Sequence, residues 1–153
     1  MEKTLLIIKP SAVLRNLVGE IIRRFEAKGI QICAMKMMQL DDKILDEHYV
    51  HLLERPYFKY IKKSMMKSPV IVCVLQGVEV VEIAHHMAGA TNGREAAPGT
   101  IRGDLSMSIQ ENIVHTSDTI ENAKAEIARF FKEDEIFEFN QIISSALYAE
   151  NEC

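Results

Sequence analysis

A single histidine, His115, ends the apolar part of "NIVHTSD" (112–118), and residues that favour the start of a helix follow it. Several cations around one imidazole suit a polyanion, because they hold its phosphate oxygens in line with a histidine nucleophile, at about 1.5–3 kcal/mol per charge-assisted contact. The ends of other expected elements carry four such cations: Lys9, Arg55, Arg94 and Arg102. These residue types predict phosphoryl transfer through His115.

A neutral imidazole attacks phosphorus only if one ring nitrogen is free, so the other should face an acceptor. The nearest candidate is Glu126, two turns into the next expected helix. A lone histidine at a strand end is more often structural than catalytic, so this hypothesis depends on the surrounding motifs. The pairs His48/His51 and His85/His86 could suggest metal ligands, but no neighbouring acid or cysteine completes a site, and we expect solvated helix positions.

The elements that must position these side chains follow from the hydrophobic pattern. "TLLIIKP" (4–10) is continuously apolar, which is typical of a strand buried on both faces. The spacing of Val18, Ile21, Ile22 and Phe25 predicts an amphipathic helix that Gly29 ends, and a strand follows over 30–40. The same criteria predict a helix over 45–53 that Pro56 stops, a short helical piece over 57–67 and a strand over 68–77. A helix over 80–88 that Gly89 closes, a strand over 112–118 and a helix over 120–130 follow, and Asp118 and Glu121 form the expected capping pair of the last helix.

The segment between Gly89 and Asn112 is polar, contains three glycines and one proline, and has no sustained period. A long ordered loop of this kind is usually functional. The element order predicts an α+β fold: a ferredoxin-like split βαβ sandwich with a four-stranded antiparallel sheet, helices on one face and a long loop that contributes to the site. Neither GxGxxG nor GxxxxGK[ST] is present, so we do not expect a Rossmann fold.

Composition favours one globular domain over residues 1–153, with 48% hydrophobic and 26% charged residues. The net charge of -4 argues against bulk binding to nucleic acid or to an anionic membrane. Without a signal peptide or an apolar run that could span a bilayer, the expected location is cytoplasmic. Cys33, Cys73 and Cys153 are widely spaced, so free thiols are expected rather than disulfides.

Several motifs in a fixed order resemble the nucleoside diphosphate kinase family: "TLLIIKP", "LVGEIIRRFEAKG", "HYVHLLERPYF", "SPVIVCVLQG", "GATN", "PGTIRGD" and "NIVHTSD". The resemblance implies a ping-pong reaction that moves the γ-phosphate of a nucleoside triphosphate such as ATP to a nucleoside diphosphate through a phosphohistidine on His115. Such a reaction maintains nucleotide pools. It implies Mg²⁺ carried on the nucleotide phosphates without metal ligands from the protein, and a homo-hexamer or homo-tetramer.

The resemblance also implies roles for individual residues. Glu126 and Ser117 would support His115, and the remaining roles go to the nucleotide: phosphates or sugar for Lys9, Tyr49, Thr91 and Arg102, the ribose side for Asn112, and the two faces of the base for Tyr57 and Ile109. Stacking reads no base edge, so broad base specificity is expected.

Two departures from the family pattern affect the expected site. His85 stands where the family usually has an arginine that contacts the terminal phosphates. An imidazole is only partly protonated near neutral pH whereas a guanidinium is always charged, so we expect weaker nucleotide binding that strengthens toward lower pH, unless Arg94 substitutes. Gly93 replaces a frequent proline, which could loosen the long loop.

Two other functions remain open. A nucleotide-binding scaffold of the same fold could have lost efficient turnover together with the usual arginine. Alternatively, a histidine phosphocarrier would donate to proteins instead of nucleotides. The joint presence of the candidate residues argues against both alternatives.

Overall fold

The sheet at the centre of the fold has four strands, and the computed structural model describes residues 1–152, with only the backbone of Ser144 and Ser145. The strands are β1 (Glu2–Ile8), β2 (Gln31–Met38), β3 (Val70–Gly77) and β4 (Val114–Thr116). Their order is β2-β3-β1-β4, and every pair is antiparallel. Because β3 lies between β1 and β2, the connection from β1 to β2 forms a split βαβ unit, which confirms the predicted fold class.

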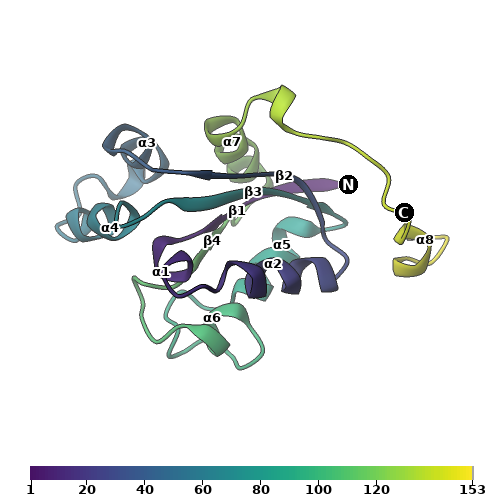
Figure 1. Ribbon diagram of the computed structural model, residues 1–153, viewed down its shortest axis with the longest axis horizontal. Coiled ribbons are helices and arrows are strands. Elements are labelled where there is room, and N and C mark those ends of the chain that lie inside the picture. The colour runs from purple at the N-terminus through teal and green to yellow at the C-terminus, as the bar shows by residue number, and fades with distance from the viewer. Residues whose placement is uncertain (153) are drawn as a thin grey trace.

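Helices cover both faces of this sheet, so the expectation of helices on one face was wrong (Figure 1). Leu6 and Ile8 of β1 face α1 (Pro10–Val13), α2 (Val18–Ala27), α5 (Val80–Ala88) and α6 (Ile101–Leu105). Leu5 and Ile7 face α3 (Asp42–His48), α4 (Phe58–Met65) and α7 (Ile120–Phe130). The physical reason lies in β1 itself, since successive side chains of a strand point to opposite faces and an unbroken apolar run needs cover on both.

The helix ends follow local chemistry. Gly29 and Gly89 have φ angles of 91° and 83°, and each follows a helix as predicted. The predicted capping pair of α7 was wrong by one residue, because Thr119 accepts the hydrogen bond from the amide of Asn122. The helix predicted over 45–53 is divided into α3 and the 3-10 turn η1 (Val50–Leu52).

The long loop between α5 and β4 is held against the body of the fold. It contains α6, and Asp104 of that helix pairs with Arg24 of α2 at 2.7 Å. The backbone amide of Gly93 donates to the carbonyl of Ser108 at 3.2 Å, a bond that proline could not make. Gly93 thus joins the two sides of the loop through its amide, and the expected loosening of the loop stays a prediction.

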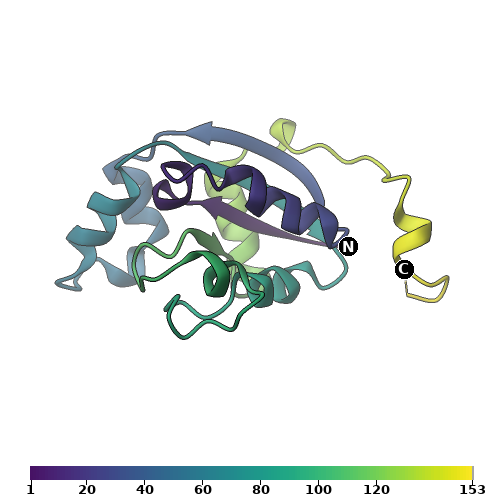
Figure 2. The same cartoon turned by 60° about the horizontal axis from the view of Figure 1, so that its bottom comes forward.

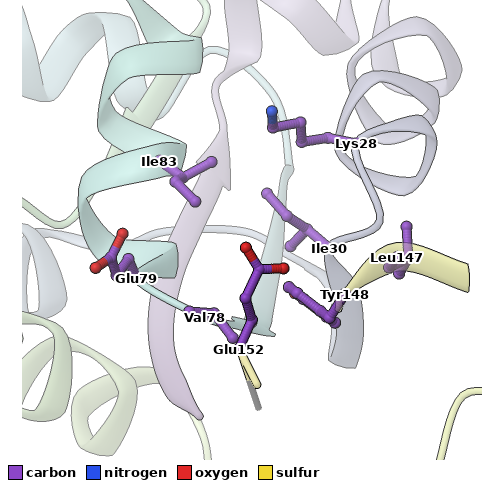
Figure 3. Close-up of a pocket in the computed structure, with 9 residues that line it drawn as sticks. Lys28, Ile30, Val78, Glu79, Ile83, Leu147, Tyr148 and Glu152 are labelled. Atoms are coloured by element: carbon purple, nitrogen blue, oxygen red, sulfur yellow. The ribbon is translucent and has the colours of Figure 1, made fainter. Parts of the chain in front are cut away.

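The chain after α7 passes through η2 (Glu133–Glu135) and follows the β2 edge, where the amide of Phe137 donates to the carbonyl of Cys33 at 2.9 Å. It then runs to α8 (Ser144–Leu147), which stands apart from the other helices (Figure 2). The last described residues of the chain and the ends of α2 and β3 line an open cavity of about 440 Å³ (Figure 3). Lys28, Ile83 and Tyr148 line it, and none of the predicted site residues does. In the described part of the chain, no helix has the length and apolar character needed to cross a membrane.

Candidate functional site

The predicted nucleophile, the middle residue of β4, meets its predicted partner from α7. Nε2 of His115 lies 3.0 Å from Oε2 of Glu126, which α7 carries. The hydroxyl of Ser117 donates to the same carboxylate oxygen at 2.6 Å and accepts from the amide of Leu5 at 3.3 Å. The sheet therefore fixes Ser117, Ser117 fixes Glu126, and Glu126 orients His115.

This arrangement assigns the ring proton of His115. Burial alone would raise the pKa of Glu126, but the hydrogen bonds from His115 and Ser117 outweigh it and lower that pKa to about 2. An ionised carboxylate only accepts, so Nε2 must donate to it. Nδ1 is then the ring nitrogen with a lone pair available for attack, and the His115 side chain is 21% exposed.

The side chain packed behind His115 was not among the predicted site residues. His48, expected on a solvated helix face, is only 7% exposed, and its ring lies 4.6 Å from that of His115 at 80°. Arg129 of α7 places Nη1 3.2 Å from Nδ1 of His48. A detectable signal existed, because His48 follows the apolar Leu45 by three residues and so shares its buried face of α3.

Arg102 holds the backbone that immediately precedes the nucleophile in the chain. Its Nε, Nη1 and Nη2 donate to the carbonyls of Asn112, Gly89 and Val114 at 3.1, 2.6 and 2.8 Å. Between two of these acceptors Ile113 has a φ of 63°, which is strained for a β-branched residue and costs about 1–3 kcal/mol. Arg102 is 6% exposed, and each terminal nitrogen keeps one N–H that these three bonds do not use.

Lys9 and Asn112 form the adjoining wall. Nζ of Lys9 donates to Oδ1 of Asn112 at 2.6 Å, and the amide nitrogen of Asn112 donates to the carbonyls of Thr91 and Ile109. Burial, and then the charge of Arg102, lower the pKa of Lys9 to about 7. The wall therefore carries closely spaced basic groups that an anion would stabilise.

The other predicted residues lie at different depths. The hydroxyl of Tyr49 is buried, which raises its pKa, and its ring meets that of His48 at 4.7 Å. Tyr57 and Ile109 are 47% and 59% exposed. The loop carrying Ile109 is tied to α4 because Gln110 donates to the carbonyl of Tyr60 at 3.1 Å.

Two further predicted residues occupy the rim. The side chains of Thr91 and His85 are exposed, and Nδ1 of His85 lies 3.4 Å from the hydroxyl of Thr116, the residue that follows His115 in β4. Arg94, the expected substitute for His85, is also exposed. Glu126 thus contacts His115 directly, and Arg102 reaches it through the backbone of Asn112 and Val114. Lys9 joins this group through its hydrogen bond to Asn112. Tyr57 and Ile109 are exposed at the surface.

Taken together, these contacts create an oriented imidazole with one free nitrogen beside buried cations. This combination suits nucleophilic attack on an anionic phosphorus centre, because the cations stabilise the charge on the phosphate oxygens.

Comparison with known proteins agrees with this chemistry. Residues 2–136 match the family model described as nucleoside diphosphate kinase. A nucleoside diphosphate kinase from Parabacteroides distasonis is 56% identical over 152 residues, covering 99% of both chains. A second, from Pyrococcus horikoshii, is 48% identical over 141 residues and 90% of each chain.

A solved structure shows the same relationship in three dimensions. The halophilic nucleoside diphosphate kinase from Halobacterium salinarum, in complex with CDP, matches with a TM-score of 0.94 at 33% identity. The match covers 97% of this chain and 99% of that one. The resemblance seen in the motifs is confirmed: the chain belongs to the nucleoside diphosphate kinase family.

Proposed function

We propose that the chain transfers the γ-phosphate of a nucleoside triphosphate to a nucleoside diphosphate through a phosphohistidine at Nδ1 of His115. In the first half-reaction, the Nδ1 lone pair forms a bond to phosphorus, and the bond to the bridging oxygen breaks as the diphosphate leaves with its electron pair. In the second, a terminal oxygen of another diphosphate takes the phosphoryl group and Nδ1 regains its lone pair. The carrying observation is the 3.0 Å contact that commits Nε2 to Glu126.

The basic wall would bind the phosphates. Lys9 and the remaining N–H groups of Arg102 supply charge-assisted donors, and Tyr49 supplies a hydroxyl that burial keeps protonated. Asn112 and Thr91 would face the sugar, and His85 at the rim would meet the outer phosphates. Tyr57 and Ile109 would sandwich the base, and their exposed side chains fit a site that accepts any base.

Mg²⁺ is the proposed cofactor, held by the oxygens of the nucleotide phosphates. The donor set fits this role, because the wall consists of cations and amides and the carboxylates near it already have partners. Glu126 is engaged by His115 and Ser117, and Glu111, which lies near Lys9, pairs with Lys67 at 2.7 Å. When bound, the ion would neutralise charge on the leaving diphosphate. Lys9 and Arg102 would orient the same phosphates.

A phosphorylation assay tests the proposed function. Wild-type protein mixed with γ-labelled ATP should acquire an acid-labile label and lose it on addition of GDP or UDP. His115→Asn should acquire none, whereas His86→Asn should behave as wild type, since His86 is exposed on α5. An equally labelled His115→Asn would contradict the proposal.

The same assay separates the alternatives. Tight nucleotide binding without exchange would favour a scaffold, and faster release of the label to a protein than to GDP would favour a phosphocarrier. Agreement of the candidate residues with one contiguous site supports the enzyme over both.

We also propose a homo-oligomer in the cytoplasm, either a hexamer or a tetramer. Large apolar side chains are exposed on the β2 edge and in the C-terminal segment, including Met35, Met37, Phe137 and Ile142. Such surfaces mark protein contacts. The buried thiols of Cys33 and Cys73 are free, which suits a reducing compartment; Cys153 lies outside the described residues. Light scattering on the purified protein measures the subunit number.

A further inference from the structure

His48 is packed between the nucleophile and the core. Its ring meets His115 at 4.6 Å and Phe130 at 5.4 Å, both nearly perpendicular. The residue closes α3, whereas Phe130 closes α7 and His115 belongs to β4. Three elements therefore hold one aromatic cluster, in which the ring of His48 lies directly against that of His115.

Arg129 fixes the protonation of His48. A guanidinium only donates, so the contact at 3.2 Å makes Nδ1 of His48 the acceptor and leaves the ring proton on Nε2. Burial lowers the pKa of His48 to about 3, and the neighbouring His115 lowers it further in the same direction. His48 is thus a neutral ring with a defined tautomer.

The same groups could suggest a metal site, because ligand atoms of His48, His115 and Glu126 lie within 4.8 Å of one another. The hydrogen bonds argue against a metal. Glu126 is already engaged by His115 and Ser117, and a metal on Nε2 of His48 would move the ring proton to Nδ1, against Arg129. A cation would also meet the charge of that guanidinium.

We propose that His48 is a positioning residue for His115: its ring, held by Arg129 and Phe130, fixes the plane of the catalytic imidazole. His115 needs this support because its hydrogen bond to Glu126 restrains one ring nitrogen only. A perpendicular neighbour restrains rotation of the ring, so that Nε2 stays on Glu126 and Nδ1 faces the phosphate. The inference rests on the proposed phosphohistidine function and adds a residue to it.

Single-turnover phosphorylation by ATP is the test, with three variants and one control. His48→Leu removes the ring and should slow phosphorylation about 100-fold, while the nucleotide Kd changes less than about twofold. His48→Phe keeps a ring and should recover to within about fivefold of wild type, and Arg129→Met should lose about tenfold. Arg23→Met, an exposed arginine of α2, should match wild type.

A second measurement separates positioning from simple loss of structure. ¹⁵N NMR should show the proton of His115 on Nε2 in wild type and a mixture of tautomers in His48→Leu, at matched folded fractions by circular dichroism. ³¹P NMR of the phosphorylated variant should then show some phosphate on Nε2.

Three results would overturn the role of His48. The first is a phosphorylation rate of His48→Leu within about twofold of wild type. The second is a loss of phosphorylation rate that merely follows the folded fraction, with unchanged ¹⁵N shifts of His115. The third is tight Zn²⁺ binding that requires His48. A wild-type protein that carries no phosphate on His115 would instead contradict the proposed function, so the two failures are distinguishable.

Discussion

Nucleotide binding should be accompanied by proton uptake at Lys9. In the free protein, burial and the charge of Arg102 hold the pKa of Lys9 at about 7. A bound polyphosphate places negative charge at Nζ and should raise that pKa to about 9 or more. The bound state then holds more protons than the free state wherever the pH lies between these two values.

The size of the effect follows from the two pKa values. At about pH 8, roughly nine-tenths of the free Lys9 side chains are neutral and nearly all bound ones are charged, so binding takes up about 0.8–0.9 proton. At about pH 6, uptake falls to about 0.1 proton. By linkage, the contribution of Lys9 makes binding about tenfold weaker at pH 8 than at pH 6.

Isothermal titration calorimetry measures this uptake. The binding enthalpy of Mg-ADP, recorded in buffers of different ionisation enthalpy at about pH 8, has a slope equal to the number of protons taken up. Lys9→Arg is the matched variant, because arginine stays charged and should abolish the Lys9 contribution while keeping a phosphate contact. A zero slope in wild type, or the same slope in Lys9→Arg, would refute this reasoning.

Three further predictions concern the surrounding residues. Because the pKa of Glu126 is lowered to about 2, its ionised form stabilises the fold by about 3 kcal/mol above pH 4.5, and this contribution disappears as the pH falls toward 2. The free energies of unfolding of wild type and Glu126→Gln, measured with denaturant, should therefore converge in acid. A difference that stays constant with pH would contradict this prediction. Arg102→Lys should lower the free energy of unfolding by about 3 kcal/mol or more, since the single nitrogen of an ammonium cannot take the place of three separate guanidinium nitrogens that donate to the carbonyls of Asn112, Gly89 and Val114. An unchanged urea midpoint would argue against this framework role. Tyr57→Ala should raise the Kd of ADP, GDP, CDP and UDP alike by about 10–100-fold, and a loss confined to one base in fluorescence titrations would exclude simple stacking.

Local patterns predicted the sheet and the central contact of the site. The apolar run of β1, the glycines after α2 and α5, and the helix that carries Glu126 all follow from short-range periodicity. The predicted partnership of His115 and Glu126 is consistent with the 3.0 Å contact, because α7 packs back on the sheet and so carries Glu126 past the strand that precedes it.

Tertiary packing decided the features that the sequence did not reveal. The burial of His48 depends on α3 lying beside α7, and α3 is separated from His115 by more than sixty residues of chain. Arg102 was predicted to contact phosphates, yet its three carbonyl bonds follow from how the long loop folds back on β4. The apolar run of β1 indicated that helices cover both faces of the sheet. The prediction of helices on one face followed the expected ferredoxin-like topology instead.

The position of the phosphoryl group on His115 can be measured by ³¹P NMR of wild-type protein phosphorylated with ATP. Since Glu126 occupies Nε2, the phosphate should reside on Nδ1 and leave on addition of a nucleoside diphosphate. Phosphate on Nε2, or on a residue other than His115, would contradict the proposed orientation of the nucleophile.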